Sequence, residues 1–185
     1  MVLSSKGGCG FTRIGERQEW QGHIVSCNVV EVQGPDGQVY EREIVRHPGA
    51  AVIVALEDEE VVMLRQYRAS VDGELLEIPA GKLDNPDELP ELTAQRELAE
   101  EIGKRAGHLE LLGVFHNSPG FCDEVTYCYL ATELHDVERE PHSIEEQYMK
   151  IEKVKLQDIP DLVASGELRD AKSIVGLMLA REHCR

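Results

Sequence analysis

The chain has 185 residues, enough for one domain with a complete core and a small extension. It is 42% hydrophobic and 29% charged, which is typical of globular proteins, and it has no run of about 18 apolar residues that could span a membrane. Its formal charge of -16 argues against nucleic acid as a partner, because phosphate backbones are bound by an excess of basic residues.

The N-terminus and the cysteines indicate the compartment. The first ten residues, MVLSSKGGCG, lack the apolar core of a signal peptide. The five cysteines form no CxxC pair, so we expect reduced thiols and neither a disulfide framework nor a zinc site: positions 9, 27, 122, 128 and 184. Both features predict a cytoplasmic protein.

The N-terminal part alternates between apolar and polar residues. HIVSCNVVEV (23–32) and QVYEREIV (38–45) flank the turn GPDG (34–37), which predicts a β-hairpin. The hairpin carries more apolar surface than a free two-stranded ribbon can bury. We therefore divide the chain into an N-terminal β-rich segment, residues 1–46, and a main domain, residues 47–185.

The main domain is predicted to mix strands and helices. Three strands are expected first, at 49–56, 60–68 and 74–83, the last breaking at Pro79 and Gly81. A helix ending at Gly103 follows, and then two strands on either side of the Asn-Ser-Pro-Gly loop at 117–120. Last come a strand at 148–156, a short helix closed by Gly166, and a helix over 169–183. This final helix has Asp170 as a possible N-cap and an apolar stripe at 174, 175, 178 and 179.

Three acidic residues crowd one face of the helix AQRELAEEIG (94–103). Glu97, Glu100 and Glu101 are spaced i, i+3 and i+4, so their side chains share a face. That face borders the apolar stripe that would seat the helix on a core: Ala94, Leu98 and Ile102. The repulsion between the acids is tolerable if a hard divalent cation sits among their oxygens, and the alternative is a solvated acidic face.

Read outward from this helix, GKLDNPDELPELTAQRELAEEIGK (81–104) strongly resembles the Nudix box, G-x5-E-x7-R-E-U-x-E-E-x-G-U, with U a bulky aliphatic residue. The matching residues are Gly81, Glu88, Arg96, Glu97, Leu98, Glu100, Glu101 and Gly103. Two departures are visible: six residues separate Gly81 from Glu88, and Lys104 occupies the last aliphatic place. The extra residue falls in a loop, where insertions cost little. The resemblance favours a metal site over a solvated face.

The resemblance implies a fold and a chemistry. The fold would be a Nudix-type α/β/α sandwich with a mixed sheet, preceded by an N-terminal antiparallel β subdomain. Nudix hydrolases cleave a nucleoside diphosphate linked to another group with divalent metal ions, here Mg²⁺, or Mn²⁺ as an alternative. The implied metal ligands are the backbone carbonyl of Ala80 and the side chains of Glu97, Glu100 and Glu101. Glu100 is also a candidate catalytic residue. Arg96 and Glu88 would brace the loop and helix, although an ordinary i,i+4 pair with Glu100 explains Arg96 equally well.

Sequence outside the box is similar to the ADP-ribose pyrophosphatase branch of this family. The similar phrases are EREIVRHPGAAVIVAL, VVMLRQYR, LLEIPAGKLD and HNSPGFCDE, with Pro119 fifteen residues after Lys104. The resemblance implies hydrolysis of ADP-ribose to AMP and ribose 5-phosphate, with Arg46 and Arg68 as cationic substrate contacts. It also implies that Trp20 stacks on adenine, and that residues 1–46 form the dimerisation segment of a homodimer. The plainer alternatives are surface ion pairs for the two arginines and simple packing for Trp20.

The general base is the least defined assignment. The branch takes it from a glutamate on a flexible loop well after the box, and the matching stretch here is EREPHSIEEQYMK (138–150). Glu146 is the first candidate and Glu145 the second, against the alternative of a solvated acidic loop.

Two other functions remain open. One is a pyrophosphatase of another nucleotide sugar, such as GDP-mannose or UDP-glucose, because the box is common to all of them. The other is a sensor that binds ADP-ribose without hydrolysing it, or a regulator built on this fold. The intact acidic residues at 97, 100 and 101 speak against a sensor.

Overall fold

The computed structural model describes residues 9–185. Its contacts divide the chain into two compact units, each with its own sheet. The first unit is the chain up to Pro48 together with Ser118–Glu124, and the second is Gly49–Asn117 with Val125–Arg185. Residues 1–8 of the predicted N-terminal segment lie outside the described residues.

The first unit contains a three-stranded antiparallel sheet instead of a two-stranded hairpin. The predicted hairpin corresponds to β2 (Ser26–Gln33) and β3 (Val39–Arg46), and β1 (Thr12–Gln21) pairs with the free edge of β2. The sequence analysis missed β1 because TRIGERQEWQ is polar on both faces and shows no clean alternation. Its residues are almost all exposed, so backbone hydrogen bonds to β2 hold this strand rather than burial.

A short loop extends the first unit beyond its strands. The amide of Val45 donates to the carbonyl of Phe121 at 2.7 Å, and the amide of Asp123 donates back to Val45 at 3.1 Å. The carboxylate of Asp123 also accepts from Arg46 at 2.8 Å and from the amide of His47 at 2.9 Å. These bonds fix residues 118–124 against the end of β3.

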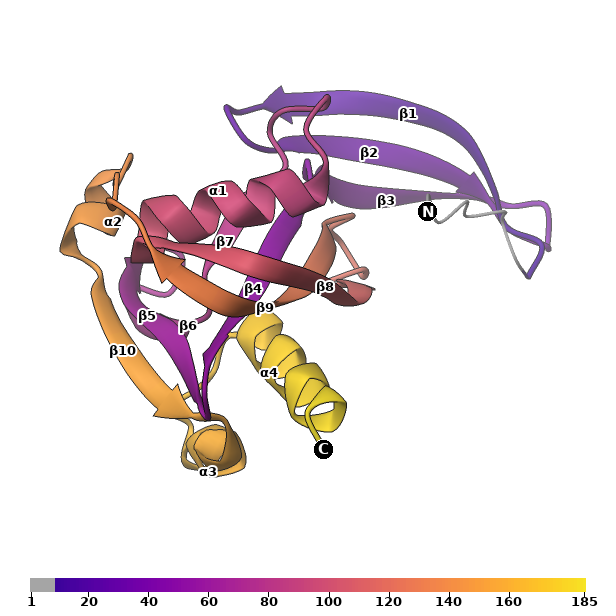
Figure 1. Ribbon diagram of the computed structural model, residues 1–185. Helices are drawn as coiled ribbons and strands as arrows, with labels where there is room; N and C mark the ends of the chain where they lie inside the picture. Colours follow the sequence, from indigo (N-terminus) through magenta and orange to yellow (C-terminus); the bar gives the residue numbers. More distant parts are fainter. Residues whose placement is uncertain (1–8) are drawn as a thin grey trace. The chain divides into compact units, whose positions relative to one another are not determined.

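The second unit is built on a seven-stranded mixed sheet (Figure 1). Its central path runs β10-β5-β4-β9-β8, with β6 paired to β5 and β7 paired to β4. Only β4 and β9 run parallel. The strands are β4 (Ala50–Glu57), β5 (Glu60–Arg68), β6 (Gly73–Glu77), β7 (Ala80–Lys82), β8 (Lys104–His116), β9 (Val125–Asp136) and β10 (Lys150–Lys155).

Helices cover both faces of this sheet. They are α1 (Pro90–Ile102), the short α2 (Ile144–Tyr148), α3 (Ile159–Ser165), which follows a 3₁₀ turn at Leu156–Asp158, and α4 (Ala171–His183). Alternate residues of β4 point to opposite sides, so Ile53 packs with Leu98 of α1 and Val54 packs in the core that includes Leu177 of α4. The predicted α/β/α sandwich with a mixed sheet and a separate antiparallel sheet is therefore confirmed.

Two local predictions about these elements are wrong. The strand predicted at 74–83 breaks at Ile78–Pro79, but Gly81 lies inside β7. In α4 the buried residues are Ser173, Gly176, Leu177 and Ala180, not the larger apolar residues that the stripe predicted. Three of these four residues have small side chains, and Leu177 is the exception. The helix lies close to the sheet: a Cβ atom at Gly176 would come within 3.0 Å of Cys128 Sγ and Ile78 Cδ1.

The start of α4 supports the strands that carry the site. Asp170 is the N-cap, as predicted, and its carboxylate accepts from the Ser173 amide at 2.9 Å and the Ser173 hydroxyl at 2.7 Å. The same hydroxyl accepts from the amide of Ile78 at 2.9 Å. This hydrogen bond attaches the connection between β6 and β7 to the start of α4. Within residues 9–185, no helix is both long and apolar enough to cross a membrane.

Candidate active site

Helix α1 carries two glutamates on its buried face. It starts with Pro90, where the missing amide hydrogen costs nothing, and Gly103 ends it in the left-handed conformation at φ 64°. Glu97 and Glu101 lie among the buried residues of this helix, only 8% and 5% exposed. Carboxylates are rarely buried to this extent without a partner, so this face of α1 is a candidate site.

Strand β7 approaches α1 at the position of Glu97. A Cβ atom at Gly81 would overlap the Glu97 carboxylate, so a larger residue here would displace the Glu97 side chain from this position. One residue earlier, the amide of Ala80 donates to Oε2 of Glu101 at 2.9 Å. The structure therefore brings together three of the four predicted metal-ligand positions, Ala80, Glu97 and Glu101.

Both buried carboxyl groups have raised pKa values. Burial raises the pKa of Glu97 to about 7, against the opposing pull of the Arg96 guanidinium. Burial, followed by the neighbouring charge of Glu97, raises the pKa of Glu101 well above its usual range, although the Ala80 amide works in the other direction. Each negative charge at this site is therefore costly unless a cation accompanies it.

Arg96 supplies part of that positive charge. Its Nη1 donates to Glu97 at 2.8 Å and to Glu100 at 2.9 Å, and its Nη2 lies 3.6 Å from Glu88. The hydroxyl of Thr93 donates to the same Glu88 carboxylate at 2.8 Å. Arg96 thus makes the i,i+4 pair with Glu100 and also ties the loop before α1 to the helix.

The donor set fits a hard divalent cation in its chemistry. Glu97, Glu100 and Glu101 offer carboxylate oxygens on one side of α1, with the backbone of Ala80 beside them. Within the described part of the chain, however, no three His, Cys, Asp or Glu side chains converge closely enough to hold a metal ion. The oxygens are instead directed at Arg96 and the Ala80 amide, so a cation would have to draw them from these partners.

The two candidates for the general base differ in burial. The predicted loop contains the short helix α2, in which Glu146 is half-buried and Glu145 is exposed. Glu146 lies close enough to raise the pKa values of Glu97 and Glu101 by its charge. Burial pushes the pKa of Glu146 upward, but hydrogen bonds from the His142 amide and from Ser143 outweigh it and hold that pKa below its usual range.

Arg68 is held rigidly near the acids. Its Nε and Nη2 donate to the two oxygens of Glu77 at 2.7 and 2.6 Å, and the Glu77 side chain is almost fully buried. The positive charge of Arg68 in turn pulls the pKa of Glu101 downward. Its side chain remains 38% exposed, so part of it is accessible.

The other two predicted substrate contacts belong to the first unit. Trp20, on β1, is 55% exposed, and its ring lies over Gly22, where a Cβ atom would overlap it. Arg46, at the end of β3, pairs with Glu16 at 2.9 Å and with Asp123 at 2.8 Å.

One residue of this site was not predicted from the sequence. Glu77, the partner of Arg68, interrupts the apolar run LLEIP, and a charge within such a run should have indicated a buried ion pair. His142, which the sequence places near the site without the spacing of a ligand, has Nδ1 at 3.6 Å from Glu100.

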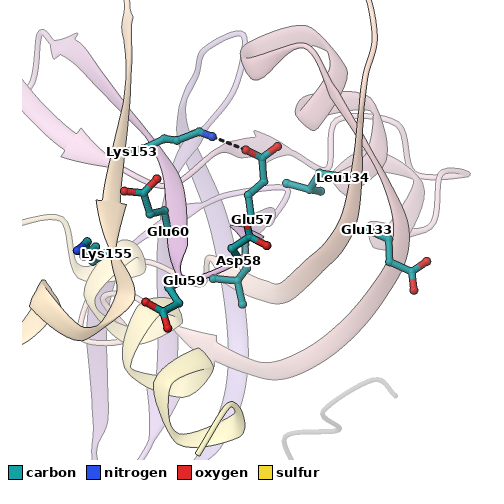
Figure 2. Close-up of a pocket in the computed structure, with 9 residues that line it drawn as sticks. Glu57, Asp58, Glu59, Glu60, Glu133, Leu134, Lys153 and Lys155 are labelled. Atoms are coloured by element: carbon teal, nitrogen blue, oxygen red, sulfur yellow. Dashed lines mark ion pairs between the residues drawn. The ribbon is translucent and has the colours of Figure 1, made fainter.

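A separate cavity of about 770 Å³ lies at the turn between β4 and β5 (Figure 2). Among its lining residues, Glu57 accepts from Lys153 at 2.6 Å, and Lys104 donates to the same carboxylate at 2.5 Å. Lys104 and then Lys153 hold the pKa of Glu57 below its usual range. Glu57 and Lys153 are thus paired within the lining of this cavity, and none of the predicted site residues lines it.

Comparison with known proteins identifies the family. The model of the NUDIX domain matches residues 45–172, more than half of the chain. The chain belongs to the Nudix family. The predicted membership is confirmed, and the matched span contains α1, β7 and α2.

Three Nudix relatives and one solved structure are similar over most of the chain. An "ADP-ribose pyrophosphatase" of Bacillus subtilis is 40% identical, covering 86% of each chain. A "Methanol dehydrogenase activator" of Bacillus methanolicus is 35% identical over the same shares, and an "ADP-ribose pyrophosphatase" of Mycobacterium tuberculosis is 36% identical over 91% of this chain and 82% of the relative. The structure titled "Crystal structure of ADP compounds hydrolase" superimposes with a TM-score of 0.82 at 21% identity, covering 94% of both chains, which supports the fold.

The raised pKa of Glu97 predicts a pH-dependent stability in the absence of metal. A carboxyl group whose pKa is raised on folding binds more protons in the folded state, so stability is full at low pH and falls as pH rises toward the folded value, about 7. With chelator present, the free energy of unfolding should drop by roughly 1–3 kcal/mol between pH 5 and 8, and Glu97→Gln should reduce that drop. Urea titrations measure both.

The matched control for this measurement is Glu91→Gln, which removes an exposed acid from the first turn of the same helix. It should keep the wild-type pH dependence. If Glu97→Gln also kept it unchanged, the burial of an ionised Glu97 would not be the source of the cost.

Proposed function

We propose that this protein hydrolyses the pyrophosphate bond of ADP-ribose, yielding AMP and ribose 5-phosphate, with Mg²⁺ as the activating ion. The observation that carries the proposal is the pair of buried carboxylates, Glu97 and Glu101, facing β7 where Gly81 and Ala80 approach α1. Relatives called ADP-ribose pyrophosphatase share 36 and 40% of their residues with the chain, which favours ADP-ribose among the nucleotide sugars.

The metal ion would be held by Glu97, Glu100, Glu101 and the backbone carbonyl of Ala80. Bound there, it supplies positive charge for the pyrophosphate oxygens and acts as a Lewis acid. Arg96 is placed to hold Glu97 and Glu100 in position, since it already contacts both carboxylates. Because negative charge at Glu97 and Glu101 is costly when alone, binding a cation there relieves repulsion that the fold otherwise carries.

Glu146 is proposed as the general base. Its carboxylate is ionised at neutral pH, so it can accept the proton of the attacking water, and its lowered pKa makes it a weaker base than an unperturbed glutamate. The water oxygen bonds to one phosphorus, and the bridging oxygen leaves with the other phosphate group. Arg68, fixed by Glu77, would present its accessible part to a phosphate or ribose oxygen.

Two further proposals concern the first unit and its assembly. Arg46 is proposed to contact the substrate, and the exposed ring of Trp20 to stack on adenine. Exposed apolar side chains on this unit include Phe11, Ile14, Ile24 and Val39, which favour residues 1–46 as the dimerisation segment of a homodimer. The five free thiols, of which Cys128 is buried, fit a cytoplasmic enzyme.

The assembly has a direct measurement. Light scattering at micromolar concentration should give twice the mass of the 20.7 kDa chain. Val39→Asp, which places a charge in the exposed apolar surface of β3, should shift the mass toward the monomer, whereas Glu43→Ala, an exposed change on the same strand, should not. A monomer mass for the unaltered chain would contradict the homodimer.

The substrate and the metal are tested together by a panel of nucleotide sugars. With millimolar Mg²⁺, AMP release from ADP-ribose should exceed hydrolysis of GDP-mannose and UDP-glucose, and chelator should abolish it. Glu101→Gln should lower kcat by at least about 100-fold, because it removes a charged ligand from the most deeply buried part of the site.

Two other outcomes of the substrate panel would change the proposed function. Faster hydrolysis of GDP-mannose or UDP-glucose would reassign the substrate within the family. Tight binding of ADP-ribose with no hydrolysis of any nucleotide sugar would replace the enzyme by a sensor.

The assignment of the base is tested by two adjacent substitutions. Glu146→Gln should lower kcat for ADP-ribose by about 10²–10⁴-fold with little change in KM, because proton transfer occurs only in the transition state. Glu145→Gln, one residue away and exposed, is the matched control and should stay near the wild-type rate. The opposite ranking would move the base to Glu145.

A further inference from the structure

Arg139 lies in the segment that connects β9 to α2. This segment crosses the end of α1: the amide of Val137 donates to the carbonyl of Gly103 at 2.9 Å. Figure 1 shows α2 beside this end of α1. The segment passes close to the backbone of Gly103, where a Cβ atom would come within 3.3 Å of Arg139 Cβ.

The guanidinium of Arg139 bridges the backbones of two helices. Its Nε donates to the carbonyl of Glu101, the last acid of α1, at 2.6 Å. Its Nη2 donates to the carbonyl of Glu146, in α2, at 2.5 Å. One side chain therefore connects the residue proposed as a metal ligand with the residue proposed as the base.

The end of α1 has a particular need for this cation. The last carbonyls of a helix lack partners within the helix and carry partial negative charge, and α1 has no basic residue in its last turn. Arg139, which lies in another segment, supplies the positive charge that α1 lacks in its own last turn. Its hydrogen bond to the Glu101 carbonyl therefore links the end of α1 to what the guanidinium contacts on its other side.

Apart from its contact with β5, helix α2 has little else to fix it. It contains five residues and none of them is buried, with Ile144 and Tyr148 61% and 80% exposed. The bonds of Ser143 to Glu146 lie within the helix and its cap, so they shape α2 without attaching it. Only Met149, just after the helix, is buried in the core on the α1 side of the sheet.

We propose that Arg139 is a positioning residue that fixes the backbone of Glu146 relative to α1, so that the base stays at a set distance from the carboxylates of Glu97 and Glu101. This inference rests on the proposed function, in which Glu146 takes the proton from water. It predicts that the effect of Arg139 on turnover is transmitted through Glu146.

The test is a double-mutant comparison of ADP-ribose hydrolysis with Mg²⁺ in the full chain. Arg139→Ala should lower kcat by about tenfold or more while KM stays within about threefold, because two hydrogen bonds from a charged donor are lost away from the substrate. In a Glu146→Gln background the same substitution should have no further effect on kcat. Arg139→Lys, which can reach one of the two carbonyls, should restore part of the rate and serves if the alanine variant fails to fold.

The matched control is Arg105→Ala, which removes an exposed arginine at the start of β8 and should leave kcat unchanged. Equal losses from Arg139→Ala with and without Glu146 would overturn the inference, because Arg139 would then act independently of the base. An unaltered kcat in Arg139→Ala, or in Glu146→Gln, would overturn it as well.

Hydrogen exchange tests the same inference without any turnover. Amides of residues 144–148 should exchange about tenfold faster in Arg139→Ala, while those of α4 keep their wild-type rates. Unchanged exchange over 144–148 would overturn the inference even in an active enzyme. Faster exchange in a chain that hydrolyses no nucleotide sugar would support the link that Arg139 makes between α1 and α2. It would show that the proposed function, and not this link, is wrong.

Discussion

The close packing of two ionisable side chains against a strand governs the second unit. Glu97 and Glu101 are one helical turn apart on α1, so any burial of this helix face buries both carboxyl groups. Gly81 permits the approach of β7, and the Ala80 amide gives Glu101 a fixed hydrogen bond. Arg96 neutralises only part of the remaining negative charge, and its side chain is about a third exposed. A divalent cation is the partner that would complete this arrangement.

The surrounding elements maintain this geometry from three directions. Ser173 and Asp170, at the start of α4, hold the amide of Ile78 and so fix the strands that carry Glu77 and Ala80. The buried Glu77 orients the guanidinium of Arg68. The segment between β9 and α2 fixes the end of α1 through the hydrogen bond from the Val137 amide to the Gly103 carbonyl. The site is thus rigid where ligands are needed, and α2 is its least buried element.

The sequence predicted the parts of the site that depend on local spacing. The i, i+4 pattern of the acids, the end of α1 at Gly103 and the N-cap Asp170 follow from helix geometry and were found in the structure. The pairing of Arg68 with Glu77 could not be read in this way, since the two residues lie on neighbouring strands without being opposite each other: Arg68 pairs with Gly73 and Glu77 with Leu64. Strand β1 escaped detection because hydrogen bonds hold it with almost no burial. The stripe on α4 was misplaced because the face toward the sheet combines Leu177 with the small residues Ser173, Gly176 and Ala180, which an apolar stripe does not reveal.

If the buried acids of α1 form a divalent-cation site, the protein should bind Mn²⁺ in the absence of substrate. The signal of free Mn²⁺ in electron paramagnetic resonance should decrease when the protein is added, and Mg²⁺ should restore it by competition. Glu101→Gln should weaken the binding of Mn²⁺ by about tenfold or more, since it removes the most deeply buried charged ligand. Glu91→Gln should leave the affinity unchanged. Equal Mn²⁺ affinity in wild type and Glu101→Gln would rule out a site at the buried acids, because the cation would then bind elsewhere.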